Sequence, residues 1–163
     1  DRDNLSNGGI SDSPGFYNTG LYNIDSEGSY PEGQTGLYEI TENIEDMGRF
    51  RVPSLRNVEV TGPWGHDGSY SSLEDVIRAY ARGGRLVQSG VNAGDGVNSP
   101  FVDPLVSGFE ITDDERKDVL AFLSSLTDQS MLENTLFSNP FCIDNDSDVE
   151  GCIKPKMGPG SDE

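Results

Sequence analysis

Apolar residues recur with helical spacing in two segments of the chain, residues 72–82 and residues 113–126. In the first segment, four apolar side chains follow the spacing i, i+3, i+4, i+7: Leu73, Val76, Ile77 and Tyr80. In the second, the apolar stripe consists of Val119, Leu120, Phe122, Leu123 and Leu126. Such stripes are typical of helices that bury one face. The pattern therefore predicts two helices, the first with Tyr80 as the last residue of its buried face.

Both predicted helices begin at a capping box, in which two residues satisfy each other's backbone N–H groups. The pairs that fit are Ser71 with Glu74, or in an alternative frame Ser72 with Asp75, and, for the second helix, Thr112 with Glu115. Gly83 follows the first helix and supplies a left-handed stop. A third, short helical turn is expected at residues 130–135, and no segment shows a convincing strand alternation.

Residues 1–49 and 85–108 lack either apolar period and are expected to be loops rich in Gly, Asn and Ser. The first of these loops carries aromatic residues at intervals: Phe16, Tyr17, Tyr22, Tyr30 and Tyr38. Irregular backbone with spaced aromatic side chains usually covers apolar material. That material is either a bound group or the core of the domain itself.

The composition favours one domain with a small core. Only 33% of the 163 residues are apolar, and the 20 glycines indicate many turns. Such a core is often completed by a cofactor or a partner surface. We expect a domain over residues 1–138 and an acidic tail over residues 139–163. The spacing of Cys142 and Cys152 in that tail suits a small disulfide loop, with two unpaired thiols as the alternative.

The charge of the chain excludes several partners. A net charge of −18 argues against binding to nucleic acid and to anionic lipid, since both need clustered Lys and Arg. No apolar run reaches transmembrane length, so no membrane insertion is expected. High negative charge suits an exported protein or one with a basic partner.

Residues 50–80, FRVPSLRNVEVTGPWGHDGSYSSLEDVIRAY, hold the only histidine and the only tryptophan of the chain. Taken singly, His66 would be a surface histidine, Arg56 a solvated charge and Tyr80 a core residue. Together they lie on a path that Pro and Gly residues make rigid, and such paths commonly present polar groups to a ligand.

This segment, with the GG pair after it and ITDDERKDVLAFLSSLTD further on, resembles the C-terminal haem domain of the bacterial di-haem cytochrome c peroxidases. The resemblance covers roughly residues 15–140. The stretches FYNTGLYNIDSEGSYPEGQTGLYEIT and DMGRFRVPSLRN look closer to the MauG- and MbnH-like branch. The resemblance implies a mainly α, cytochrome c-like haem domain with long ordered loops and few or no strands, its helices packed around a haem-sized cavity.

The resemblance also implies a function. Such enzymes are di-haem c-type oxidoreductases of the periplasm or the cell exterior. They use hydrogen peroxide, or oxygen plus electrons, to oxidise a partner protein or to accept electrons from one. This chain would hold the six-coordinate electron-relay haem, with haem c and calcium as cofactors. Its partners would be an N-terminal haem domain or a second chain, and a protein donor or substrate.

Six residues match positions of the family. Tyr80 matches the second axial ligand of the relay haem, and a phenolate suits ferric iron. Arg56 matches an arginine near the haem propionates. His66 matches a histidine beside the haem that does not bind iron, and Trp64 stands where a tyrosine is usual, either as a redox-active ring or as packing. The backbone carbonyls of Thr61 and Pro63 match calcium ligands.

The chain departs from the family in three respects. It contains no Cys-x-x-Cys-His motif, through which haem c is attached, and no N-terminal haem domain with its peroxide site. Tyr17 stands where relatives have histidine. Three interpretations are open: a piece of a larger enzyme, a half that assembles with a haem-bearing chain, or a haem-free acidic binding module on a cytochrome-like scaffold.

Overall fold

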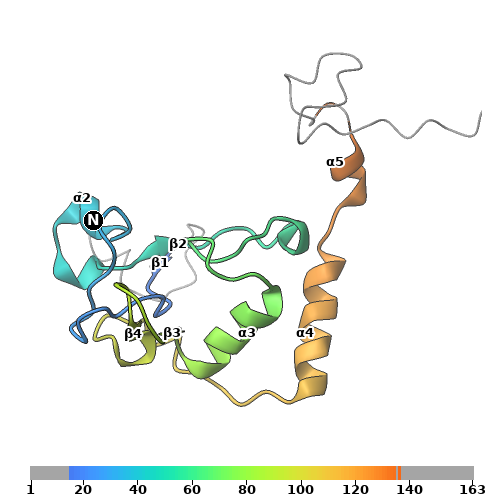
Figure 1. Ribbon diagram of the computed structural model, residues 1–163. Coiled ribbons are helices and arrows are strands. Elements are labelled where there is room, and N and C mark those ends of the chain that lie inside the picture. The colour runs from blue at the N-terminus through green and yellow to red at the C-terminus, as the bar shows by residue number, and fades with distance from the viewer. Residues whose placement is uncertain (1–14, 135, 137–163) are drawn as a thin grey trace, which may run out of the picture. The chain divides into compact units, whose positions relative to one another are not determined.

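The computed structural model describes residues 15–134 and residue 136 (Figure 1). The chain divides into two units between Leu126 and Thr127. The helices of the first unit are α2 (Tyr38–Thr41), α3 (Leu73–Arg82) and α4 (Asp113–Ser125), with 3-10 turns η1 (Ile44–Asp46), η2 (Val58–Val60) and η3 (Gly96–Asn98). Its strands are β1 (Phe16–Tyr17), β2 (Phe50–Arg51), β3 (Leu86–Val87) and β4 (Gly94–Asp95). No helix in the described ranges is long and apolar enough to cross a membrane.

Helix α3 lies where the apolar spacing predicts it, and its start follows the alternative capping frame. The Ser72 hydroxyl accepts a hydrogen bond from the Asp75 N–H at 3.1 Å, so the frame of Ser71 with Glu74 is wrong. The helix ends at Gly83, which has a positive φ of 89° and donates its N–H to the Tyr80 carbonyl. The left-handed stop is confirmed, because glycine adopts this conformation without a Cβ clash.

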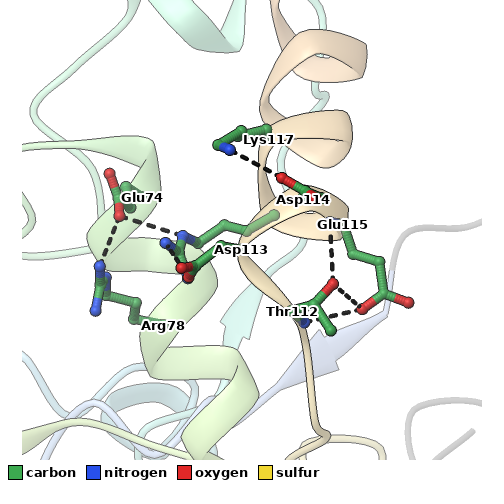
Figure 2. Close-up of polar contacts among 8 residues, drawn as sticks. Glu74, Arg78, Thr112, Asp113, Asp114, Glu115 and Lys117 are labelled. Atoms are coloured by element: carbon green, nitrogen blue, oxygen red, sulfur yellow. Dashed lines mark hydrogen bonds and ion pairs between the residues drawn. The ribbon is translucent and has the colours of Figure 1, made fainter.

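The frame of Ser71 with Glu74 fails for a physical reason, and Figure 2 shows Glu74 with its partner Arg78. The Glu74 carboxylate faces two arginines, accepting from Arg78 at 2.7 Å and from the Arg116 Nε at 3.2 Å. Arg116, from α4, also pairs with Asp113 at 2.8 Å. Glu74 therefore joins α3 to α4 instead of closing a capping box. Each of these partly exposed pairs contributes little to stability on its own.

Helix α4 begins with the predicted capping box. The Thr112 hydroxyl accepts from the Glu115 N–H at 3.3 Å, and the Glu115 carboxylate accepts from the Thr112 N–H at 2.8 Å (Figure 2). The predicted apolar stripe is only partly covered, since Phe122 is 58% exposed and Val119 is 38% exposed. None of the α4 residues is fully buried.

The two small sheets were not anticipated from the sequence. β1 pairs with β2 and β3 with β4, both antiparallel. Two-residue strands carry no alternation, because a period of two needs about four or more residues to be visible. The mainly α, cytochrome c-like class stays a prediction.

The core of the first unit is built largely by the predicted N-terminal loop. Its buried cluster consists of Leu21, Tyr22, Tyr30 and Met47. Two of the spaced aromatic residues, Tyr22 and Tyr30, thus belong to the core of the domain itself, with rings in edge contact at 5.6 Å. Tyr38 and Phe50 pack against the same cluster.

Two buried asparagines tie this loop together. Asn18 is 0% exposed: its amide donates to the Met47 carbonyl at 2.7 Å, and its oxygen accepts from the Gly20 N–H and the Tyr30 hydroxyl, each at 2.8 Å. The Asn23 amide donates to the Asp95 carbonyl at 2.9 Å. These side-chain amides therefore replace hydrogen bonds that a β-sheet would provide. They pair backbone groups that irregular chain would otherwise leave unpaired.

In the second unit, α5 (Gln129–Glu133) lies near the predicted turn at residues 130–135. Asp128 caps this helix by accepting from the Ser130 and Met131 N–H groups. The proposed disulfide between Cys142 and Cys152 lies outside the described residues.

Candidate functional site

The segment that follows β2 forms an exposed, partly apolar surface. Residues Arg51 to Ser54 line an open depression of about 630 Å³. Arg56 follows, fully on the surface, with its backbone N–H donating to the Ser54 hydroxyl at 3.2 Å. No carboxylate in the described part of the chain pairs with the Arg56 guanidinium. This arginine is therefore available to an anionic group.

Tyr80 does not behave as the last core residue of α3. Leu73 and Ile77 on the same face are buried, whereas Tyr80 is 43% exposed. Its hydroxyl makes no hydrogen bond with any described residue. Partial burial of the ring raises the pKa of Tyr80. A half-covered ring with an unpartnered oxygen is typical of a side chain that contacts a group outside its own helix.

The other aromatic residues of the segment have structural partners. The exposed His66 ring stacks on Phe50 at 3.7 Å between ring centres. The Trp64 Nε1–H donates to the Val58 carbonyl at 2.8 Å, and Trp64 exchanges backbone hydrogen bonds with Tyr70. These contacts fit the packing interpretation of Trp64, since its one polar group is already used.

The two predicted calcium ligands lie at the end of η2. The Thr61 hydroxyl donates to the Val58 carbonyl at 3.2 Å. Within residues 15–134, no backbone N–H donates to the carbonyl oxygen of Thr61 or of Pro63. Both carbonyls can therefore serve a cation. The described residues contain no cluster of three or more His, Cys, Asp or Glu side chains that could hold a metal ion.

The residue types of the segment from residue 50 to residue 80 fit a haem. A haem needs an apolar lining, a ligand for iron and cations near its propionates. Apolar side chains about half exposed along the segment are Val52, Leu55 and Val60. Tyr80 offers an oxygen ligand and Arg56 a guanidinium. The covalent attachment motif of haem c is not in the 163 residues.

A cluster that was not predicted from the sequence joins three residues that lie far apart along the chain. The Tyr22 hydroxyl donates to the Asp67 carboxylate at 2.6 Å, and Arg85 donates to the same oxygen at 3.0 Å. The Arg85 guanidinium also lies over the rings of Tyr22 and Tyr70, at 5.3 and 5.7 Å from their centres. The Asp67 side chain is only 6% exposed. The one hint in the sequence was an acidic residue directly after His66.

The cluster shifts the protonation of its members. Burial raises the pKa of Tyr22, and the hydrogen bond to Asp67 adds to this effect. Burial acts to raise the pKa of Asp67, yet hydrogen bonds from Tyr22 and Ser69 and the Arg85 charge lower it overall. Burial also raises the pKa of Tyr70 to about 12. Asp67 is therefore ionised at neutral pH while the tyrosines keep their protons.

Known proteins resemble this chain over most of its length. The cytochrome-c peroxidase IdrP1 of Pseudomonas sp. (strain SCT) is 33% identical over 145 residues, which span 81% of this chain and 34% of that protein. The methylamine utilization protein MauG of Paracoccus denitrificans is 35% identical over 99 residues, 54% of this chain and 25% of MauG. No family model matches the chain.

A solved structure gives a further comparison. It is described as a MauG-like protein associated with microbial copper homeostasis. It shares 49% sequence identity and a TM-score of 0.74, covering 77% of this chain and 36% of the other. The chain thus spans about a third of the length of IdrP1 and of this structure. On these similarities, the chain belongs to the di-haem cytochrome c peroxidase/MauG family.

Proposed function

We propose that this chain is the C-terminal part of a haem-dependent oxidoreductase, in which Tyr80 would bind the iron of the electron-relay haem. The observation that carries the proposal is the half-exposed Tyr80, whose hydroxyl has no partner among the described residues. The high identity with a MauG-like structure supports it. When bound, haem would carry the oxidising equivalents or electrons exchanged with peroxide or oxygen and with a protein partner.

Ligation by Tyr80 requires the loss of its phenolic proton. Partial burial raises the pKa of Tyr80, so the neutral phenol is favoured when no cation is near. A bound metal cation reverses this balance, because it favours the anionic form of its ligand. The Tyr80 phenol therefore keeps its proton until a metal cation binds, and no described residue competes for its oxygen.

The residues after β2 would position the rest of the group. Arg56, with no described carboxylate partner, would pair with a propionate. The stacked pair of His66 and Phe50 would border the cofactor, and half-exposed apolar side chains such as Leu55 would exclude water from it. In this proposal the domain is cytochrome c-like, works in the periplasm or outside the cell, and meets a second haem domain and a protein donor or substrate.

Calcium is a finer part of the same proposal. The carbonyls of Thr61 and Pro63, which accept no backbone hydrogen bond within residues 15–134, would supply two of the oxygen ligands that calcium requires. Removal of calcium from the complete protein by a chelator should lower its midpoint of thermal unfolding, and added calcium should restore it. A complete protein that contains no calcium by elemental analysis, and that gains no stability when calcium is added, would exclude this site.

The test of Tyr80 uses the complete haem-loaded protein that contains this chain. Tyr80→Phe keeps the ring and removes only the oxygen. We expect the low-spin six-coordinate haem signal in electron paramagnetic resonance to be lost, with a shift toward high spin and a changed reduction potential. Tyr38→Phe, in a half-buried tyrosine that packs against the core, is the matched control and should leave the spectrum unchanged.

Two outcomes would count against the proposal. An unaltered spectrum and potential in Tyr80→Phe would remove Tyr80 as a ligand. A complete protein without a Soret band would favour the alternative, a haem-free acidic binding module.

A further inference from the structure

We propose that Tyr22 is a redox-active tyrosine, with Asp67 as its proton acceptor and Arg85 as the residue that positions Asp67. The site lies inside the loop-built core and is distinct from the Tyr80 surface. The identity of the physiological oxidant of Tyr22 rests on the proposed function. The transfer of the proton from Tyr22 to Asp67 does not. The proposal stands on the geometry of one partly buried hydrogen bond and the ion pair beside it.

A tyrosine gives up an electron readily only if its proton can leave as well, since the oxidised phenol is a strong acid. Tyr22 is 7% exposed, so water is not a ready acceptor. Its hydroxyl instead donates to the Asp67 carboxylate at 2.6 Å, a short charge-assisted bond. The proton has to move only along this bond, which is the arrangement that general base catalysis requires.

The neighbouring Tyr30 shows what is special about Tyr22. Tyr30 is equally buried, at 6% exposed, and its ring touches that of Tyr22. Its hydroxyl, however, donates to the amide oxygen of Asn18 at 2.8 Å. An amide oxygen is a poor base, so Tyr30 has no described group that would take its proton. Burial and a donated hydrogen bond are shared by the two residues, whereas the acceptor is a carboxylate for Tyr22 and an amide oxygen for Tyr30.

Arg85 keeps the acceptor ready. It donates to the same Asp67 oxygen at 3.0 Å and lies over the Tyr22 ring. The guanidinium holds the carboxylate ionised, and Ser69 donates its N–H to the other carboxylate oxygen at 3.0 Å. These contacts fix the orientation of Asp67, so the proton returns to the same tyrosine when the radical is reduced.

Oxidation of Tyr22 moves one electron and one proton. One electron leaves the Tyr22 ring for a high-potential one-electron oxidant, which the haem centres of the proposed oxidoreductase would supply. The phenolic O–H bond breaks and an O–H bond forms on Asp67. The products are a neutral tyrosyl radical, a neutral carboxylic acid and the reduced oxidant. A protein or small-molecule electron donor then reduces the radical, and Asp67 returns the proton.

Arg85 also connects this site to a further aromatic residue. Its guanidinium lies over the rings of Tyr22 and Tyr70 alike, at 5.3 and 5.7 Å from their centres. In the proposed oxidoreductase, Tyr22 would store an oxidising equivalent that the haem has received.

The test uses the complete haem-loaded protein and a ruthenium tris-bipyridine photo-oxidant with a sacrificial quencher, which needs no peroxide chemistry. We expect a tyrosyl radical in electron paramagnetic resonance after the flash, with a line shape that narrows when the tyrosines are ring-deuterated. The long-lived signal should be lost in Tyr22→Phe and retained in the matched control Tyr30→Phe. Circular dichroism confirms that each variant is folded.

Asp67→Asn gives an independent reading. The asparagine keeps an oxygen that can accept the hydrogen bond but cannot take the proton. Radical formation should slow at least tenfold and should become dependent on buffer concentration. If Tyr22→Phe does not fold, the rate of radical formation in Asp67→Asn tests the role of Tyr22 by itself.

The outcomes separate the two proposals. An undiminished signal in folded Tyr22→Phe, or an unchanged rate in Asp67→Asn, would overturn the role of Tyr22. A radical that forms with the photo-oxidant but never with peroxide would support the Tyr22 site and count against the peroxidase function.

Discussion

Asn18 shows how single polar side chains stabilise an irregular core. It is completely buried and makes three hydrogen bonds, with Met47, Gly20 and Tyr30. Each partner is itself buried, so it could not turn to water if Asn18 were lost. Buried polar groups of this kind contribute little when paired and cost much when one partner is removed.

Asn18→Ala should therefore lower the free energy of unfolding by about 2–4 kcal/mol, because it leaves three buried groups unpaired. Urea unfolding followed by circular dichroism would measure the change. Asn98→Ala, at an exposed position in η3, is the control and should cost less than about 0.5 kcal/mol. Equal losses in the two variants would show that the hydrogen bonds of Asn18 do not stabilise the core.

The helices were predictable because their signals are local. The cap of α4 needs only Thr112 and Glu115, and the stop of α3 needs only Gly83. The choice between the two frames at the start of α3 could not be read from the sequence, because Arg116 of a later helix engages Glu74. The small sheets and the loop core depend on partners far along the chain in the same way.

The two candidate frames at the start of α3 differ in what their serines should contribute. Ser72→Ala removes the acceptor for the Asp75 N–H and should lower the free energy of unfolding by about 1 kcal/mol. Ser71→Ala removes only an exposed contact with the Asp75 side chain and should cost a few tenths, roughly the value of a surface substitution. Thermal unfolding of both variants measures the difference. A larger loss in Ser71→Ala would favour the other frame.

The candidate site was predictable only in part. Arg56, His66 and Tyr80 are unusual residue types within one segment, and the structure places all of them at its surface. Nothing in the sequence indicated that Asp67 would meet Tyr22, because that contact requires the N-terminal loop to fold back over the segment. The proposed ligands of haem and calcium are one side chain, Tyr80, and two backbone carbonyls, and such ligands form no motif in the sequence.

At the scale of the whole molecule, the buried tyrosines of the described residues make the free energy of unfolding depend on pH in the alkaline range. Burial raises the pKa of Tyr30 and of Tyr70 to about 12, above the ordinary value of 10.0. Because the folded-state pKa is raised, the unfolded chain loses these protons first as the pH rises. The stabilisation is complete below about pH 10 and is lost between about pH 10 and 12.

We therefore expect the free energy of unfolding to fall over this pH range, with Tyr30 alone accounting for on the order of 2–3 kcal/mol. Denaturant titrations at pH 9, 10, 11 and 12 would measure it. Tyr30→Phe cannot ionise at this position and should show a flatter profile. A pH-independent stability of the native chain over this range would contradict the burial of these phenols.

The hydrogen bonds that close the core also set the order in which the protein can form. The Asn18 carbonyl accepts from Asp103, the Gly20 carbonyl from Arg85, and the Asn23 amide donates to Asp95. The first loop therefore cannot form these hydrogen bonds until the chain as far as residue 103 is present. Loops closed over such long separations slow folding, because their entropy is lost before the contacts are gained. We expect refolding to be slow, and slower still when Asn18 is replaced, if these contacts form in the transition state.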